Sequence, residues 1–409
     1  MVGVNSCRAC GSPLQAPFLD LGVVPLANNI LRRDQLQCQE PKYALATTYC
    51  SNCSLVQLTE NVSPKDMFEH YVYRSSYSDT MLSHVRKLAS ELVVRERLND
   101  KSLVVEVASN DGYLLKNYIE HGVPVLGIDP AANIAEIAEK EAGVPTLVEF
   151  FNKDIAQGLV NQGKQADIIH AHNVLAHVPD PNELIGGFSV LLKETGIAVV
   201  EVPYVRDLIE KLEFDTIYHE HYSYFSLIAL NNLAVANGLI IKDVQRVEIH
   251  GGSLRVEFSK PNVVASPRVA EFLAEEQEAG IGDEGFYALF ATKVAEFKQE
   301  FVKLLQSLKD EGASIAAYGA SAKGSTLLSY TEIGRETLDF VADRSLLKQD
   351  HYSPGGHIPI VSTEEVLKQK PDYLLLLVWN FADEIIAQQA GYSEQGGKFI
   401  VPLPELKII

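Results

Sequence analysis

Apolar and polar positions change their spacing three times along the chain. Residues 1–70 contain only short apolar runs, such as 44–49, between cysteines and prolines. This part is therefore expected to be a small, loop-rich unit with little core of its own. Over 71–101, apolar residues recur at three- and four-residue steps, which predicts an amphipathic helix. The stripe consists of Met81, Val85, Leu88 and Leu92.

From residue 103 onward, short apolar runs alternate with segments of helical length. Four runs are expected to be buried strands, and a helix is expected to begin at Tyr113 after the first of them. Strands separated by helices form a parallel sheet with helices packed on its faces. The centre of the chain therefore predicts a Rossmann-like α/β domain. The four runs are 103–107, 124–129, 166–171 and 196–202.

A long, charged and helical stretch at 262–310 precedes a second series of apolar runs. Runs at 313–319, 338–343 and 373–378 predict a second, smaller α/β unit. The α/β chain is thus expected to have three domains. Their expected bounds are 1–70, 71–260 and 261–409.

Composition narrows the class of protein. The chain has 409 residues and a formal net charge of −19, and no apolar stretch approaches the ~20 residues of a membrane span. Its start lacks the basic and apolar segments of a signal peptide, so we expect a cytoplasmic enzyme. The acidic balance disfavours nucleic acid and anionic membranes as partners. A small anionic ligand such as a nucleotide is compatible with this net negative charge, because backbone amides can hold a phosphate locally.

Four of the five cysteines form two Cys-x-x-Cys pairs, Cys7 with Cys10 and Cys50 with Cys53. Zn²⁺ takes four thiolates at ~2.3 Å, and such a closed site leaves no position for water. Metal binding would also supply folding energy to a segment that lacks a core. A redox pair or four unrelated thiols are the alternatives, but two such pairs among five cysteines favour one structural zinc ion. Cys38 is expected to be a buried or idle thiol.

The turn after the first central strand carries the candidate cofactor site. Ligands of doubly wound sheets bind beyond the carboxyl ends of the strands. Dinucleotide loops need three glycines, whereas here Ala108 and Asn110 replace glycines and Asp111 would repel a pyrophosphate. An acidic loop suits S-adenosylmethionine, which carries a sulfonium and an ammonium group, and Asp129 is placed to bind ribose hydroxyls. The candidate cofactor residues are Glu106, Ala108, Asn110, Asp111, Gly112, Asp129, Pro130 and Asn173.

Two histidine-rich segments are candidates for proton transfer. The segment 170–181 places His177 about one turn beyond the third central strand, on the same rim as the cofactor loop. Residues 218–222 read Tyr-His-Glu-His-Tyr, a spacing that does not match a helical zinc pair and fits an imidazole base with orienting neighbours. Because its histidines alternate with the other residues, an extended segment would place His219 and His221 on one face and Tyr218, Glu220 and Tyr222 on the other. The structural alternative is a buried strand.

Two further loops could approach the same pocket. His250 and Gly251 belong to a His-Gly-Gly-Ser loop, and residues 318–325 join a strand to a helix. The latter is no P-loop, because Lys323 precedes Gly324, but Ser321, Lys323 and backbone amides at a helix start could hold a diphosphate. A plain strand-to-helix turn is the alternative.

The motifs, in this order, resemble nucleotide-sugar C-methyltransferases of deoxysugar pathways, and the likeness covers nearly the whole chain. It rests on the cysteine pairs and on motifs at 71–76, 106–112, 172–179, 218–221, 250–253 and 319–324. The resemblance implies a zinc-binding N-terminal domain, a central methyl-donor domain and a C-terminal domain that helps to hold the nucleotide. It also implies that His221 is the general base, surrounded by Tyr218, Glu220, His177 and Tyr71. Residues expected at the nucleotide-diphosphate keto sugar are Tyr73, Ser75, His250, Gly251, Ser321, Lys323 and Gly324.

The chemistry implied is methylation of a carbon, expected to be C3, next to the C4 ketone of a 4-keto-6-deoxysugar. The ketone acidifies the C3 hydrogen, a base removes it, and the enolate carbon accepts the methyl group. N- or O-methylation of a nucleotide sugar is the alternative within methyltransferases, and a nicotinamide-dependent oxidoreductase is the alternative in a different enzyme class. A non-catalytic zinc module would not explain why the 218–221 motif and the cofactor loop occur together.

Overall fold

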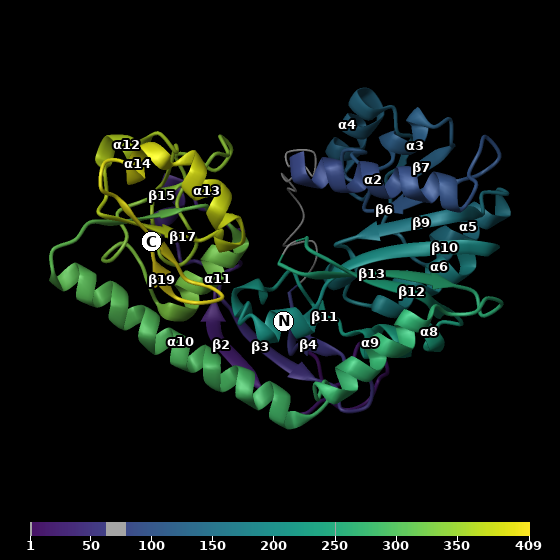
Figure 1. The fold of residues 1–409 in the computed structure, drawn as a ribbon, viewed down its shortest axis with the longest axis horizontal. Helices are drawn as coiled ribbons and strands as arrows, with labels where there is room; N and C mark the ends of the chain where they lie inside the picture. The colour runs from purple at the N-terminus through teal and green to yellow at the C-terminus, as the bar shows by residue number, and fades with distance from the viewer. Residues whose placement is uncertain (1, 63–78, 250) are drawn as a thin grey trace.

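The computed structural model describes residues 2–62, 79–249 and 251–409. Figure 1 shows a central domain and a C-terminal domain on either side of a small N-terminal sheet, with the long helix α10 (Glu284–Asp310) running below. Tyr71, Tyr73, Ser75 and His250, all expected at the site, lie outside the described residues. None of the described helices is long and apolar enough to cross a membrane.

The central domain is a seven-stranded sheet in the order β12-β13-β10-β9-β6-β7-β8. The four predicted strands are present, and β8, β7, β6, β9 and β10 are parallel. The prediction of a parallel sheet is wrong at one edge, because β13 pairs antiparallel with β10 and β12 pairs antiparallel with β13. The strands are β6 (Val104–Val107), β7 (Val125–Ile128), β8 (Thr146–Leu147), β9 (Ala166–His172), β10 (Leu192–Pro203), β12 (Ile240–Val247) and β13 (Ser253–Ser259).

Helices cover both faces of this sheet. The predicted stripe of α2 (Asp79–Arg95) is buried and packs with Val104, Ile168 and Val199 on one face. The expected helix after the first strand begins later than Tyr113, because residues 112–115 first form a turn. The other helical segments are α3 (Lys116–Glu120), α4 (Ala132–Ala142), α5 (Lys153–Asn161), η3 (Leu175–His177), α6 (Pro181–Leu191), α7 (Val205–Glu210), η4 (Phe214–Thr216) and α8 (Leu227–Ala236).

The N-terminal unit is more regular than expected, because it contains a four-stranded sheet in the order β11-β4-β3-β2. One strand, β11 (Ser223–Tyr224), comes from the central part of the chain. Aromatic side chains outside the unit complete its core: Tyr49 stacks on Tyr287 of α10 at 4.6 Å between ring centroids. Its other elements are β1 (Val2–Gly3), β2 (Leu19–Val24), η1 (Arg33–Gln37), β3 (Tyr43–Tyr49), β4 (Val56–Leu58) and β5 (Glu60–Asn61).

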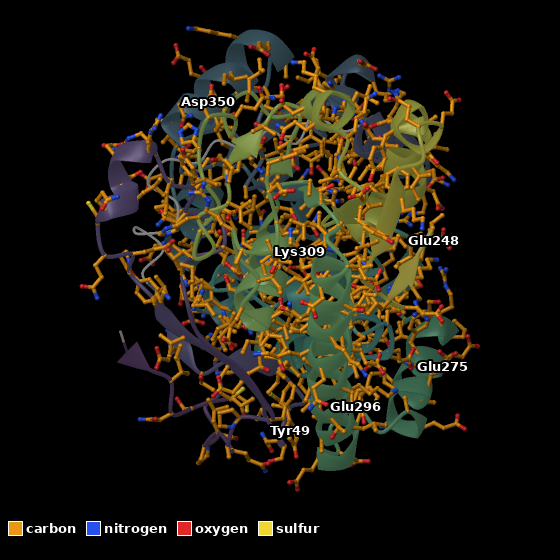
Figure 2. All side chains as sticks on the ribbon, turned by 90° about the vertical axis from the view of Figure 1, so that its left-hand side faces the viewer. Tyr49, Glu248, Glu275, Glu296, Lys309 and Asp350 are labelled. Atoms are coloured by element: carbon orange, nitrogen blue, oxygen red, sulfur yellow. The ribbon has the colours of Figure 1, made fainter. Side chains whose placement is uncertain are left out.

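The predicted helical stretch at 262–310 is two helices, α9 (Pro267–Glu278) and α10, because Gly280 and Gly282 adopt left-handed backbone angles between them. The buried residues of α10 recur at helical spacing. Glu296 and Lys309 lie on its outer side (Figure 2). The helix thus joins the N-terminal sheet and the C-terminal domain through one apolar stripe.

The C-terminal domain is a sheet in the order β16-β15-β14-β17-β18-β19, parallel except for β19. Because strands are added on both sides of β14, the topology reverses between β14 and β17, where doubly wound sheets bind ligands. The strands are β14 (Ile315–Tyr318), β15 (Val341–Ala342), β16 (Ile360–Val361), β17 (Tyr373–Leu376), β18 (Lys398–Val401) and β19 (Lys407–Ile408). The helices are α11 (Ala322–Thr331), α12 (Glu365–Gln369), η5 (Trp379–Phe381), α13 (Ala382–Gln388) and α14 (Ala390–Ser393).

Candidate active site and zinc site

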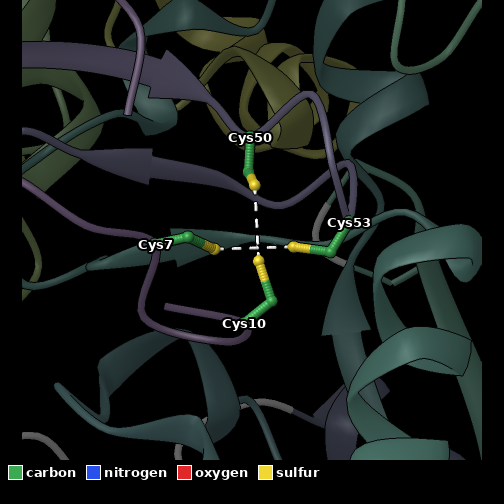
Figure 3. Close-up of side chains that lie close together, drawn as sticks. All are labelled: Cys7, Cys10, Cys50 and Cys53. Carbon is green, nitrogen blue, oxygen red and sulfur yellow. Dashed lines mark hydrogen bonds between the residues drawn. The ribbon is translucent and has the colours of Figure 1, made fainter. Parts of the chain in front are cut away.

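Four cysteine side chains converge at the end of the N-terminal unit (Figure 3). Their sulfur atoms all lie within 4.8 Å of one another, and the Cys7–Cys53 and Cys10–Cys50 sulfur pairs are 3.5 Å apart. A tetrahedron of metal–sulfur bonds of ~2.3 Å requires sulfur atoms ~3.8 Å apart, so the cluster fits a zinc ion. Cys38 is exposed and stands outside this cluster.

Both cysteine knuckles close in the same way. The N–H of Gly11 donates to the Cys7 carbonyl at 2.9 Å, and the N–H of Ser54 donates to the Cys50 carbonyl at 2.8 Å. Gly11 and Ser54 both have left-handed backbone angles, with φ of 72° and 61°. The two turns therefore direct both pairs of thiols to the same point.

The cofactor turn is built from left-handed residues. Ala108, Asn110 and Gly112 have φ of 53°, 48° and 76°, and the first two occupy the conformation that glycines adopt in dinucleotide loops. Asp129, at the end of the neighbouring strand, braces the turn, because its carboxylate accepts the N–H of Asn110 at 3.0 Å and the N–H of Ala131 at 2.9 Å. A side chain at Gly112 would come within 2.9 Å of Val144, so the backbone is packed closely there.

The edge of the sheet around this turn is acidic and buried. Burial raises the pKa of Glu106 well above its ordinary value, and the charges of Asp129 and Asp111 raise it further. Neither carboxylate oxygen of Glu106 has a hydrogen-bond partner among the residues that the structure describes. Asn173 follows β9 with φ of 55°, on the same edge of the parallel sheet. Several buried carboxyl groups at this edge fit a cationic ligand such as S-adenosylmethionine. Of the expected cofactor residues, Pro130 is exposed.

Tyr218 and His221 face each other across a turn. The prediction of an extended segment at 218–222 is wrong, because the N–H of His221 donates to the Tyr218 carbonyl at 2.9 Å. The turn brings the Tyr218 hydroxyl within 2.9 Å of Nε2 of His221. Nδ1 of His221 lies 3.0 Å from the Thr216 carbonyl, which can only accept, so Nδ1 carries the proton. In the neutral form of this tautomer, the lone pair of Nε2 points toward the tyrosine hydroxyl.

His177 and Glu220 complete this cluster. The rings of His177 and His221 are 4.7 Å apart between centroids at 74°. Burial lowers the pKa of His177 to about 4, which keeps its ring neutral. Glu220 accepts the side-chain N–H of Asn28 at 2.6 Å, and burial raises its pKa.

Three contacts fix the 218–222 turn to the rest of the molecule. The N–H of Tyr222 donates to the Ala176 carbonyl at 2.8 Å, its hydroxyl donates to the Val62 carbonyl at 2.7 Å, and its carbonyl accepts the N–H of Leu58 at 3.0 Å. The turn is thus held between η3, which follows β9, and the N-terminal sheet. This placement brings His177 and His221 together on the rim that also carries the cofactor turn.

The loop at the start of α11 faces an acidic pair that sequence reasoning missed. Nζ of Lys323 lies 4.7 Å from the centroid of the Trp379 ring. Burial raises the pKa of Glu213 and of Asp215, and the positive charge of Lys323 opposes the rise at both. Gly251 packs against Glu213, because a side chain at Gly251 would come within 2.8 Å of the carboxylate. The only sequence signal was the run 213–215, two acidic residues flanking a phenylalanine just before the Tyr-His-Glu-His-Tyr motif.

Ser321 and Gly324 have local contacts. The Ser321 hydroxyl accepts the N–H of Gly324 at 3.1 Å and so caps α11. Capping satisfies one of the free N–H groups of the first helical turn. A role for these residues at the diphosphate stays a prediction.

A buried polar row lies beneath the cofactor edge and was also missed. Tyr118 is hydrogen-bonded to His170 at 2.8 Å, and His170 to His172 at 3.0 Å. On the neighbouring strand, Glu201 accepts from Arg255 at 2.6 Å and lies 2.9 Å from His84 of α2. These contacts tie α2 and α3 to the sheet, and burial lowers the pKa of His170 well below its ordinary value.

Comparison with known proteins gives three matches to family models along the chain. Residues 7–68 match the model described as "Putative zinc binding domain", residues 81–243 match "Methyltransferase domain", and residues 248–404 match "C-methyltransferase C-terminal domain". The C-methyltransferase NovU of Streptomyces niveus is 37% identical over 99% of this chain and 97% of its own length. A ubiquinone biosynthesis O-methyltransferase of Coxiella burnetii is 25% identical over 42% of this chain and 77% of its own.

Among solved structures, the magnesium protoporphyrin IX methyltransferase of Synechocystis PCC 6803 with bound S-adenosylmethionine is similar. It is 16% identical and aligns with a TM-score of 0.35 over 49% of this chain and 92% of its own. The full-length match to a C-methyltransferase and the three family models decide between the alternatives raised by the sequence. They confirm a methyltransferase that uses S-adenosylmethionine, with a zinc-binding domain at the N-terminus and an α/β domain at the C-terminus.

Proposed function

Because the chain belongs to the C-methyltransferases that carry an N-terminal zinc-binding domain, we propose that it methylates C3 of a nucleotide-linked 4-keto-6-deoxysugar. The observation that carries this proposal is the Tyr218–His221 pair. A neutral imidazole whose Nε2 accepts from a hydroxyl group is equipped to remove a proton from carbon, provided that the carbon is acidified by a neighbouring ketone.

The pair also suggests how the oxygen of the ketone is stabilised. In the described structure the Tyr218 hydroxyl donates to Nε2 of His221. When the sugar is bound, we propose that this hydroxyl donates instead to the C4 oxygen, which leaves Nε2 to take the C3 proton. A hydrogen-bond donor that is already in place then stabilises the negative charge that develops on the C4 oxygen. His177, with a neutral buried ring beside His221, is a second candidate donor.

S-adenosylmethionine supplies an electrophilic methyl group when it is bound. Residues on the cofactor edge would hold it: the carboxyl groups of Glu106, Asp111 and Asp129 offer acceptors, and Gly112 permits close approach of the backbone. Ala108, Asn110 and Asn173 present left-handed backbone on the same edge. We propose that this edge and the 218–221 turn face the two sides of the acceptor carbon, since holding both reaction partners in the reacting geometry lowers the barrier.

We propose that the nucleotide lies against the C-terminal domain, within bounds near 261–409. The turn after β14 repeats the bracing seen at the cofactor turn: Asp343 accepts the N–H of Ala320 and the N–H of Ser345, both at 2.7 Å. Ser321 and Gly324 begin α11 beside this turn. The same arrangement at Asp129 supports a nucleoside at each turn, while 71–260 and 1–70 would form the methyl-donor and zinc-binding domains.

The test is methyl transfer to a panel of nucleotide 4-keto-6-deoxysugars, followed by mass spectrometry and by NMR of the product. We expect a gain of one methyl group at C3 of one member of the panel. The matched control is the same nucleotide sugar with a C4 hydroxyl in place of the ketone, which should stay unmethylated because its C3 hydrogen is not acidic. Methylation of an oxygen or nitrogen atom of the sugar would refute the enolate chemistry.

A further inference from the structure

The short helical turn η4 joins the C-terminal domain to the 218–222 turn. Phe214 is fully buried, and its ring lies 5.4 Å from Phe297 of α10 and 5.4 Å from Tyr330 of α11 between centroids. The carboxylate of Asp215 accepts the indole N–H of Trp379 at 2.6 Å. Both side chains therefore leave the central domain and are held by elements of the C-terminal half.

A buried carboxylate requires compensation, because removing a charge from water without a partner is unfavourable. Burial raises the pKa of Asp215, and the positive charge of Lys323 opposes this rise. Lys323 lies over the ring of Trp379, the same residue that donates to Asp215. Trp379 thus supplies the hydrogen bond to Asp215, and the positive charge of Lys323 lies over the ring of Trp379, beyond the carboxyl ends of β14 and β17.

The residue after Asp215 contacts His221 directly. The Thr216 carbonyl accepts from Nδ1 of His221 at 3.0 Å, which fixes both the tautomer and the plane of the ring. A hydrogen bond to the second nitrogen of an imidazole sets which nitrogen is left to act as a base. A continuous series of contacts therefore runs from Trp379 through Asp215 and Thr216 to His221.

We propose that Asp215 is a positioning residue that, held by the indole N–H of Trp379 with Lys323 over the Trp379 ring, fixes the tautomer and orientation of His221 through the Thr216 carbonyl. This inference rests on the proposed role of His221 as the base. It gives the C-terminal domain a part in assembling the proton-transfer site and gives Lys323 a role different from binding the diphosphate.

The experiment compares three variants, Trp379→Phe, Asp215→Ala and Lys323→Met. Trp379→Phe keeps a six-membered aromatic ring and removes the indole N–H, so it serves if Asp215→Ala fails to fold. The matched control is Lys398→Met, which removes another lysine that lies over an aromatic ring of the same domain, Tyr373 at 5.6 Å, without a link to η4. Steady-state kcat and KM are measured for each substrate.

We expect Trp379→Phe and Lys323→Met to lower kcat by about 10- to 100-fold, the usual cost of a small displacement of a reacting group, with KM for either substrate changed less than about threefold. Lys398→Met should match the wild type. If Lys323→Met raises KM for the nucleotide sugar and leaves kcat unchanged, Lys323 binds the diphosphate and the inference is overturned.

A second measurement needs no acceptor substrate. Ring ¹⁵N NMR, with the signal assigned through His221→Gln, should show His221 protonated at Nδ1 in the wild type and a mixture of tautomers in Trp379→Phe and Asp215→Ala. An unchanged Nδ1–H tautomer in both variants would overturn the inference even if every sugar in the panel were methylated. Conversely, absence of turnover in the wild type would refute the proposed substrate and leave the NMR result to decide the role of Asp215.

Discussion

Glu213 should make the protein less stable as the pH rises. Its side chain is buried with a relative exposure of 4%, and burial raises its pKa to about 7, against the opposing charges of Lys323 and Lys211. Replacing it with glutamine keeps the shape of the side chain and removes the titration. The comparison of Glu213→Gln with the wild type therefore isolates one ionisation.

The direction of the pH dependence follows from the pH at which the folded and the unfolded states each lose the Glu213 proton. The unfolded chain loses the Glu213 proton near pH 4.5, whereas the folded protein keeps it until about pH 7. The contribution to the free energy of unfolding is thus fully present below about pH 4.5 and is lost as the pH rises through about 7. At ~1.4 kcal/mol per pH unit, the difference between the two pKa values corresponds to about 3 kcal/mol.

The assay is urea unfolding at pH 5 and pH 8, followed by the fluorescence of Trp379, the single tryptophan of the chain. From pH 5 to pH 8, we expect the free energy of unfolding of Glu213→Gln to rise by up to about 3 kcal/mol relative to that of the wild type. Measuring both proteins at each pH cancels every other titrating group, the zinc ligands included. The control is Glu296→Gln on the exposed side of α10, where a surface substitution should stay within about 0.5 kcal/mol at both pH values. An equal difference between Glu213→Gln and the wild type at pH 5 and pH 8 would refute the reasoning.

Three other predictions concern the zinc site and the cofactor edge. Elemental analysis should find about one zinc per chain, lost in Cys50→Ser with a lower melting temperature and kept in Cys38→Ser; active protein free of zinc would contradict this. Gly112→Ala should cost about 2–5 kcal/mol in urea unfolding, because it adds a close contact to left-handed strain, whereas Gly122→Ala, with open space around it, should cost only about 1–2 kcal/mol; equal costs would show that the contact is relieved. Asp129→Ala should weaken binding of S-adenosylmethionine by about 1–3 kcal/mol in calorimetry, and unchanged binding would remove it from the site.

The parts of the fold that depend on local pattern were predictable. The strands from 103 to 202 are apolar runs, and the stripe of α2 follows helical spacing, so a short window contains the whole signal. The cysteine pairs were predictable for the same reason, since two thiols three residues apart already describe half of a tetrahedral site. The strands β12 and β13 were missed because polar residues alternate irregularly with apolar ones there, for example in Lys242 and Asp243.

The parts that depend on distant partners were not predictable. The 218–222 turn is held in part by a hydrogen bond from the Tyr222 hydroxyl to the carbonyl of Val62, a residue 160 positions away in the sequence. Asp215 is 164 positions from Trp379, so the sequence around Asp215 gives no indication of this buried hydrogen bond. Local sequence named the histidines and tyrosine of the site, but only the assembly of three domains shows which nitrogen of His221 is left to act.

The central claim is that His221 removes the C3 proton, and exchange of that proton separates its removal from methyl transfer. The wild-type enzyme is incubated in deuterated water with the keto sugar nucleotide and the demethylated form of the methyl donor, and deuterium at C3 is followed by NMR. We predict that the wild type exchanges the C3 hydrogen and that His221→Asn does not, while turnover with the methyl donor falls by about 10²–10⁴-fold and both substrates still bind. Methylation and exchange at near-normal rates in His221→Asn would contradict the account and transfer the role of base to His177.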